Sequence, residues 1–256
     1  MKRYFHILAI LALAVGLSFQ SGCKSGPKGD KETKKDALPE ALAKAYQEDA
    51  ARMTLREILS SNQSGEREAE LPKERVAYFY DLLSKIYWMS EKDEEIPKIS
   101  HIHTFGSPSL NQILTVLEKD AEFKENWANG RTMSSNLYLN QLMSRYKLKI
   151  KNYRDGALGP TMILESPMYV NTTELAFLLS NIDGIRHAEA QGMVGDGNDI
   201  SFGGDGKNHV AVKYSIGKGD CPSGCIHRKY WIFYLNDDGS ISYQGTRGSL
   251  PEEGEE

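Results

Sequence analysis

The sequence predicts an α+β fold in which helices come first, mixed elements follow and antiparallel strands come last. Apolar residues recur at helical spacing from residue 37 onwards. Helical and extended patterns alternate over residues 101–191, and short apolar or aromatic runs separated by turn residues fill 192–248. A chain of 256 residues is long enough to build one large core or two small ones.

Residues 37–100 are predicted to be a helical segment. One helix is expected over Ala37–Ser60, where Pro39 lies near the start, a position that helices tolerate. A second is expected from Pro72 to about Met89. The apolar stripes that define them are Leu42, Tyr46, Ala50, Met53 and Ile58 in the first helix, and Val76, Phe79, Leu83 and Ile86 in the second. Such stripes usually face a core.

Arg52 and Arg56 are one turn apart in the first predicted helix. Two guanidinium groups at this spacing can receive a carboxylate. A solvated helix face, or a pair with Asp49, explains them more simply. We therefore expect either a solvated helix face or a pair with Asp49, and not a ligand site.

Residues 101–191 are predicted to alternate strands and helices. Strands are expected at Ile113–Leu117, Lys147–Tyr153, Thr161–Leu164 and Ile185–Ala188, and helices at Ser134–Tyr146 and Asn171–Ile182. Asn171 and Glu174 form a capping-box pattern, and Gly184 ends the second helix. The order β-α-β-β-α-β is that of the ferredoxin-like fold, an antiparallel sheet with two helices on one face.

Residues 192–248 are predicted to extend this domain by an antiparallel β-meander. Its strands are expected at Asn208–Ser215, Tyr230–Leu235 and Ser240–Tyr243. The sequence NDDG joins the last two and is typical of a hairpin turn. Residues 249–256 read as an acidic, solvated tail.

The N-terminus predicts export. Basic residues at positions 2 and 3 precede a short apolar run, as in a signal peptide. The sequence SGC that follows resembles the lipobox of bacterial lipoproteins, which implies a signal peptide over 1–22 and diacylation of Cys23. Residues 23–36 would then be a flexible tether. We expect a lipid-anchored protein of the bacterial cell envelope, at the outer membrane of a diderm bacterium; a secreted chain or an uncleaved anchor is the alternative.

Three cysteines are present, so lipidation of Cys23 leaves Cys221 and Cys225 as a pair. In an oxidising compartment such a pair favours a disulfide bond that fixes the shape of one turn. A zinc site that includes His227 and Asp220, or a redox pair, is the alternative.

Three groups of residues are candidates for binding. The loop after the first predicted strand of the meander and the start of the next strand offer His227, Arg228, Tyr230 and Trp231 to a partner, because strand ends often carry recognition. The stretch 195–206 contains Asp196, Asn198, Asp199 and Asp205, oxygen donors that suit calcium, although turn formation explains them without a metal. His101 and His103 can chelate a transition metal from one side of an extended segment, but packing or surface roles explain them as well. We expect no cofactor, with calcium as the alternative.

Residues 172–191, TTELAFLLSNIDGIRHAEAQ, resemble the helix, glycine and strand that close the inhibitor domain of subtilisin propeptides. That domain is itself ferredoxin-like, so the resemblance implies this fold more than an inhibitory function.

Four other stretches resemble a group of Bacteroidetes lipoproteins and secreted proteins of uncharacterised function. They are EDAARMTLR at 48–56, IHTF at 102–105, GDGNDISF at 195–202 and GDCPSGCIHRKYW at 219–231. The resemblance spans nearly all of the mature chain and implies a fold and a compartment, but no activity.

The net charge of −4, with no basic stripe, argues against nucleic-acid binding. The sequence contains no nucleophile elbow, phosphate loop, HExxH or Rossmann glycine pattern. We therefore expect a non-enzymatic binding module that engages an envelope protein or glycan. A propeptide-like protease inhibitor or chaperone is the first alternative. A metal-dependent envelope enzyme that uses His101, His103 and His227 is the second.

Overall fold

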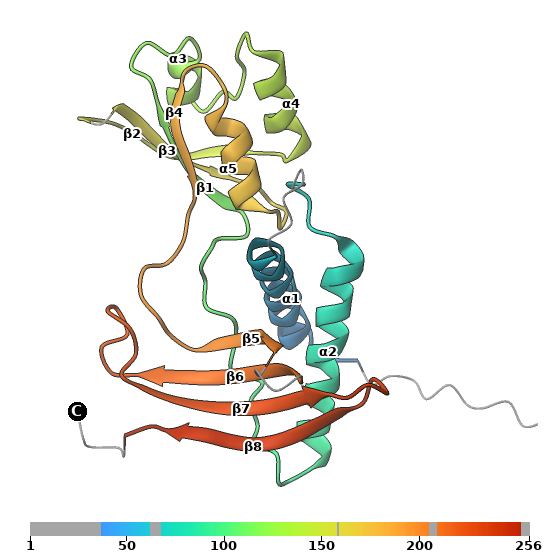
Figure 1. Cartoon of the computed structure of the whole chain (residues 1–256). Helices are drawn as coiled ribbons and strands as arrows, with labels where there is room; N and C mark the ends of the chain where they lie inside the picture. The colour runs from blue at the N-terminus through green and yellow to red at the C-terminus, as the bar shows by residue number, and fades with distance from the viewer. Residues whose placement is uncertain (1–36, 62–67, 158, 205–208, 252–256) are drawn as a thin grey trace, which may run out of the picture. The chain divides into compact units, whose positions relative to one another are not determined.

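A computed structural model describes residues 37–61, 68–157, 159–204 and 209–251 of the chain (Figure 1). These residues form a mixed α+β structure with five helices and two four-stranded antiparallel sheets. None of the helices in these ranges is long and apolar enough to cross a bilayer. The predicted signal peptide, Cys23, the tether and Asp205 lie outside the described residues, as does most of the acidic tail.

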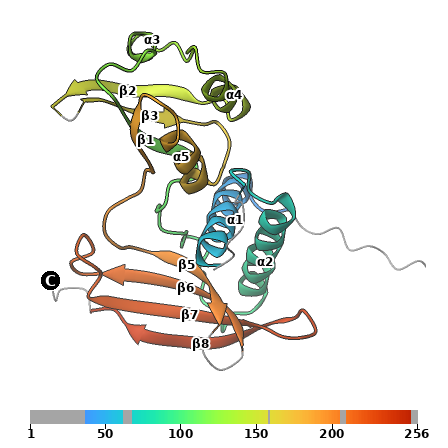
Figure 2. The same ribbon diagram turned by 45° about the horizontal axis from the view of Figure 1, so that its top comes forward.

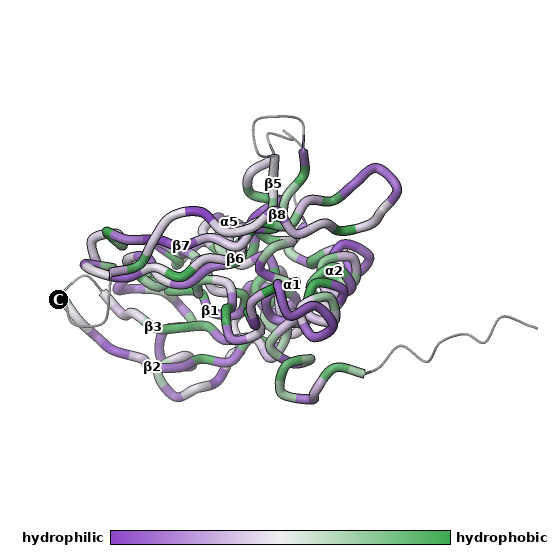
Figure 3. The backbone as a smooth tube through the Cα atoms, turned by 90° about the horizontal axis from the view of Figure 1, so that it is seen from below, coloured by the Kyte–Doolittle hydropathy of each residue, from purple (hydrophilic) through white to green (hydrophobic). Residues whose placement is uncertain are grey.

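Two long helices open the described part of the chain. They are α1 (Glu40–Ser60) and α2 (Lys73–Lys92), and each begins directly after a proline. Figure 3 shows hydrophobic and hydrophilic stretches alternating along both, so neither helix is apolar on all sides. Their buried faces share one apolar cluster, to which Tyr46, Phe79 and Leu83 contribute. Both helices agree with the predicted pattern.

The first sheet consists of β1 (Gln112–Leu117), β2 (Lys149–Gly156), β3 (Gly159–Glu165) and β4 (Ile185–Ala190), in the order β2-β3-β1-β4. The helices of this region are α3 (Lys124–Ala128), α4 (Leu137–Arg145) and α5 (Thr172–Ser180). The side chains of Asn136 and Asn171 cap α4 and α5 by accepting a backbone hydrogen bond. The short helix α3 was not predicted; it brings Trp127 into the core of this region.

The second sheet consists of β5 (Asp199–Gly204), β6 (Val210–Lys218), β7 (His227–Leu235) and β8 (Ile241–Ser249). Its strand order follows the sequence, β5-β6-β7-β8. Strand β5 was expected to be part of a turn-rich loop, because aspartate and glycine are typical of turns. Pairing with β6 overrides this preference, since Ile200 lies opposite Tyr214 and both are buried.

The second sheet and the two long helices share one core. Figures 1 and 2 both place α1 and α2 beside this sheet. Phe79 of α2 and Phe202 of β5 meet edge to face with their ring centres 4.9 Å apart. The predicted helical segment therefore packs on strands that follow it by more than a hundred residues in sequence. All members of the three apolar clusters come from Leu38 onwards, and the described residues from Leu38 onwards belong to one compact unit.

Candidate functional site

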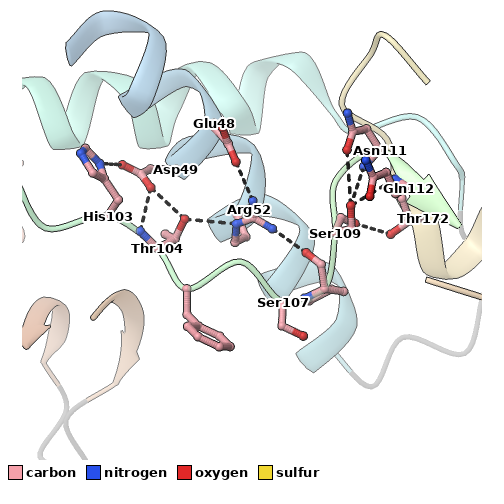
Figure 4. A network of polar contacts seen from close by, with 12 residues as sticks. Glu48, Asp49, Arg52, His103, Thr104, Ser107, Ser109, Asn111, Gln112 and Thr172 are labelled. Atoms are coloured by element: carbon pink, nitrogen blue, oxygen red, sulfur yellow. Dashed lines mark hydrogen bonds and ion pairs between the residues drawn. The ribbon is translucent and has the colours of Figure 1, made fainter. Parts of the chain in front are cut away.

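A buried carboxylate on α1 is the centre of a polar network (Figure 4). Asp49 is only 2% exposed. One of its oxygens accepts hydrogen bonds from the backbone N–H and the hydroxyl of Thr104, each 2.8 Å long, and the other lies 2.8 Å from Nδ1 of His103. A buried carboxylate is stable only when hydrogen bonds replace its hydration. Asp49 therefore fixes the start of residues 103–109, a segment that lies between α2 and β1.

Arg52 lies on the same face of α1 and continues this network. It donates to the carbonyl of Pro108 over 2.5 Å and to the hydroxyl of Thr104 over 3.2 Å, and pairs with Glu48. Arg52 is 5% exposed, so the expectation of a solvated helix face was wrong for this residue. Burial lowers the pKa of Arg52 below its ordinary value, while Glu48 opposes this effect. An arginine remains charged in either case.

Arg56, one turn further along α1, connects the segment to the second sheet. Its guanidinium lies 2.7 Å from Oδ1 of Asp199 in β5 and donates to the carbonyl of Phe105 over 2.8 Å. The same Asp199 oxygen accepts from the backbone N–H of Phe105. Arg56 and Asp199 together join α1, β5 and residues 103–109 at one point.

The other end of residues 103–109 is fixed to the region of the first sheet. The backbone N–H of Ser109 donates to Gln191, and the Thr172 hydroxyl donates to the carbonyl of Ser109 over 2.5 Å. The Ser109 hydroxyl accepts from the backbone N–H groups of Asn111 and Gln112 (Figure 4). Residues 103–109 are thus held along their length by side chains of α1 and by both sheets.

A second network holds the loop 192–198 against the loop 219–226. Nη2 of Arg228 lies 2.5 Å from Oδ1 of Asp196, and this pairing holds the pKa of Asp196 below its ordinary value. Nη1 of Arg228 donates to the carbonyl of Gly197 and to the hydroxyl of Ser215, each over 2.8 Å. The other Asp196 oxygen accepts from the backbone N–H of Cys225. One ion pair therefore connects both loops to the sheet.

The backbones of the two loops also touch. The N–H of Asp196 donates to the carbonyl of Cys221 over 2.8 Å. Gly195 has φ of +102°, and a Cβ there would lie 2.8 Å from the carbonyl oxygen of Cys221, so this approach requires glycine. Cys221 and Cys225 are at disulfide distance with Cα atoms 4.0 Å apart, as predicted.

These contacts bring together four stretches that are far apart in the sequence, 48–56, 102–105, 195–202 and 219–231. Stretch 48–56 binds stretch 102–105 through Asp49 and Thr104, and stretch 195–202 through Arg56 and Asp199. Stretch 195–202 in turn binds stretch 219–231 through Asp196 and Arg228. These four stretches are thus neighbours in the structure and build one polar framework.

Most of the candidate metal ligands among the described residues already bind other groups. Asp196 and Asp199 already pair with arginines, and the side-chain oxygen of Asn198 accepts from the backbone N–H of Gly217. His101 is exposed, while His103 binds Asp49. Within the described ranges no three His, Cys, Asp or Glu side chains gather where they could hold a metal ion.

The four predicted partner-binding residues separate into two kinds. His227 is exposed and Tyr230 is half-buried. Arg228 is occupied by Asp196, and Trp231 is 7% exposed within the core that β7 shares with the helices. Because successive strand residues point to opposite faces of a sheet, Tyr230 lies on the face opposite to that of Trp231. Only His227 and Tyr230 are available to a partner.

The two connected loops expose apolar side chains that the sequence analysis did not select. Val194 is 93% exposed, Ile226 70% and Met193 62%. Val194 precedes Gly195, which contacts Cys221 and Pro222, and Ile226 follows Cys225 and contacts Gly219. These apolar residues stand beside the glycine and cysteine motifs in the sequence, and this position could have indicated that they lie on fixed loops. Large apolar side chains on fixed loops are typical of interaction sites.

The Asp49–His103 pair predicts a pH dependence of stability. The hydrogen bond that the His103 ring donates to Asp49 raises the pKa of His103 above 6.5. The charges of Asp49 and Glu48 add to this effect, and burial opposes it. A histidine whose pKa is higher in the folded state than in the unfolded state stabilises the fold. This contribution is complete below about pH 6.5 and is lost as the pH rises through the folded-state pKa.

Urea unfolding at a series of pH values should therefore show a fall in the free energy of unfolding above about pH 6.5. The fall should be absent in His103→Gln. An identical pH profile for both chains would show that this pair does not contribute.

Comparisons with models of protein families, with curated proteins and with solved structures gave no match. The proposals below therefore depend on the geometry described above and on the sequence.

Proposed function

We propose that this chain is a lipid-anchored protein of the bacterial cell envelope that acts as a non-enzymatic protein-binding module. Its binding surface is the pair of loops 192–198 and 219–226, with Met193, Val194 and Ile226 as the apolar contacts. The observation that carries the proposal is the 93% exposure of Val194 beside backbone that hydrogen bonds hold in place.

Two features support a fixed surface. Asp196 and Arg228 connect both loops to β6, so the exposed side chains lose little conformational freedom when a partner binds. The cysteine pair further constrains the second loop. Exposed apolar groups favour a protein partner, because burying them on association removes them from water.

A photo-crosslinking amino acid at Val194, in the full chain produced in its native bacterium, tests this proposal. We expect a discrete crosslinked product with an envelope protein. The same amino acid at Glu94, exposed in the loop after α2, serves as the control and should give none. Adding Asp196→Ala should reduce the Val194 product several-fold, because the loop loses its ion pair. Equal products from both positions, or none from Val194, would contradict the proposal.

We also propose that residues 101–191 have the ferredoxin-like topology and that β5–β8 form a meander. The element order and the strand orders support this. The propeptide-like stretch forms α5, a turn at Gly184 and β4, the order that the resemblance implies. A protease inhibitor is therefore the second candidate function, and lack of inhibition across a panel of subtilisin-like proteases would exclude it.

A further inference from the structure

A pocket of about 770 Å³ lies between α1, the start of α2 and the segment that precedes α5. This volume is within the range of roughly 300–1,000 Å³ that is usual for small-molecule sites. Its walls are mainly apolar: α1 contributes Ala51, α2 contributes Val76 and Ala77, and the third wall contains Met168 and Val170.

The pocket is open because the two helices present small side chains to it. Ala51 and Ala77 both line it, where a longer side chain would occupy the space. Ala51 is buried and Ala77 is exposed, so the pocket extends from the protein interior to solvent. Tyr80, one turn beyond Ala77, continues the apolar wall along α2.

The wall opposite α1 is fixed by backbone hydrogen bonds. Glu70 and Val170 form an antiparallel bridge, and the N–H of Asn171 donates to the carbonyl of Ala69 over 2.8 Å. The Asn171 side chain donates to the carbonyl of Glu68. The pocket is therefore present before any ligand binds.

Among the described residues, the charged groups that line the pocket leave one positive charge without an ion-pair partner. Arg145 and Glu70 form an ion pair with 2.9 Å between Nη2 and Oε1, and both side chains are more than half exposed. Lys73, in the first turn of α2, forms no ion pair with any residue that the structure describes. An apolar pocket with a single unpaired cation suits a ligand with an apolar body and one anionic end.

We propose that this pocket binds an aliphatic chain that ends in an anionic group, with the anion at Lys73 and the chain against Val76, Ala77 and Met168. A free fatty acid and an acyl chain of an anionic phospholipid share this chemistry. The proposal does not depend on the loop surface, which is formed by other residues.

Displacement of a fluorescent fatty acid, cis-parinaric acid, from the full chain tests the proposal. We expect one saturable site, displacement by palmitate, and about tenfold weaker displacement by hexadecanol, which lacks the charge. Phosphatidylglycerol vesicles form a separate arm. Displacement by vesicles would identify membrane lipid as the source of the chain, and displacement by palmitate alone would identify free fatty acid.

Two variants with matched controls locate the site. Ala77→Phe should weaken parinaric acid binding at least tenfold by filling the pocket, whereas Ala41→Phe, at an exposed position of α1, should not. Lys73→Glu should weaken palmitate but not hexadecanol, and Lys92→Glu should change neither. Circular dichroism checks that each variant is folded. Absence of saturable binding, or equal binding by Ala77→Phe and the unchanged chain, would overturn the proposal.

Discussion

Replacing Asp49 with alanine should lower the free energy of unfolding by about 3 kcal/mol, since the hydrogen-bonding partners of a buried charge lose their acceptor. The backbone N–H and hydroxyl of Thr104 both donate to this carboxylate, and His103 contacts it. Arg52, almost fully buried nearby, would also lose a compensating charge. Urea unfolding followed by circular dichroism at neutral pH measures the effect.

Asp49→Asn is the matched control. Its amide oxygen can still accept from Thr104, and its amide nitrogen can donate to Nδ1 of a neutral His103. The loss should therefore be only about 1 kcal/mol, the usual value of one hydrogen bond. A loss as large as that of Asp49→Ala would show that the charge matters more than the hydrogen bonds. A loss below about 1 kcal/mol for Asp49→Ala would contradict the central role assigned to Asp49.

The helices and most strands could be predicted from the sequence because their periodicity is local. Tyr46 and Phe79, for example, recur at helical spacing with other apolar residues and are buried as expected. Strand β5 could not be predicted in this way. Its composition is typical of a turn, and only pairing with β6 and packing of Phe202 against Phe79 stabilise it as a strand.

The site was predicted only in part, for a similar reason. Nothing local to Arg52 distinguishes it from a solvated arginine, since its partners Thr104 and Pro108 are more than fifty residues away. Asp196 and Asp199 were candidate calcium ligands because the sequence does not reveal that Arg228 and Arg56 already pair with them. The close pairing of Cys221 and Cys225 is a local feature, which explains why it could be predicted.

Trp231 and Tyr230 are adjacent in β7, and their replacement should have opposite consequences. Trp231→Ala should lower the free energy of unfolding by roughly 4 kcal/mol, because it removes a large side chain from the core between α1, α2 and the second sheet. Tyr230 is half-buried and points to the other face of the sheet, so Tyr230→Ala should cost less than about 1.5 kcal/mol. Thermal and urea unfolding of the two variants measure the difference.

Trp231→Phe separates the contribution of apolar packing to stability from that of the indole N–H. The indole N–H of Trp231 is buried with no hydrogen-bond partner among the described residues, so replacing it with a phenyl ring removes an unsatisfied donor while keeping much of the apolar volume. The loss should be at most about 1.5 kcal/mol. If Trp231 were instead a contact for a partner, Trp231→Ala would keep normal stability and lose the crosslink from Val194. Because its side chain is in the core, we expect the reverse: reduced stability, with crosslinking retained in the molecules that remain folded.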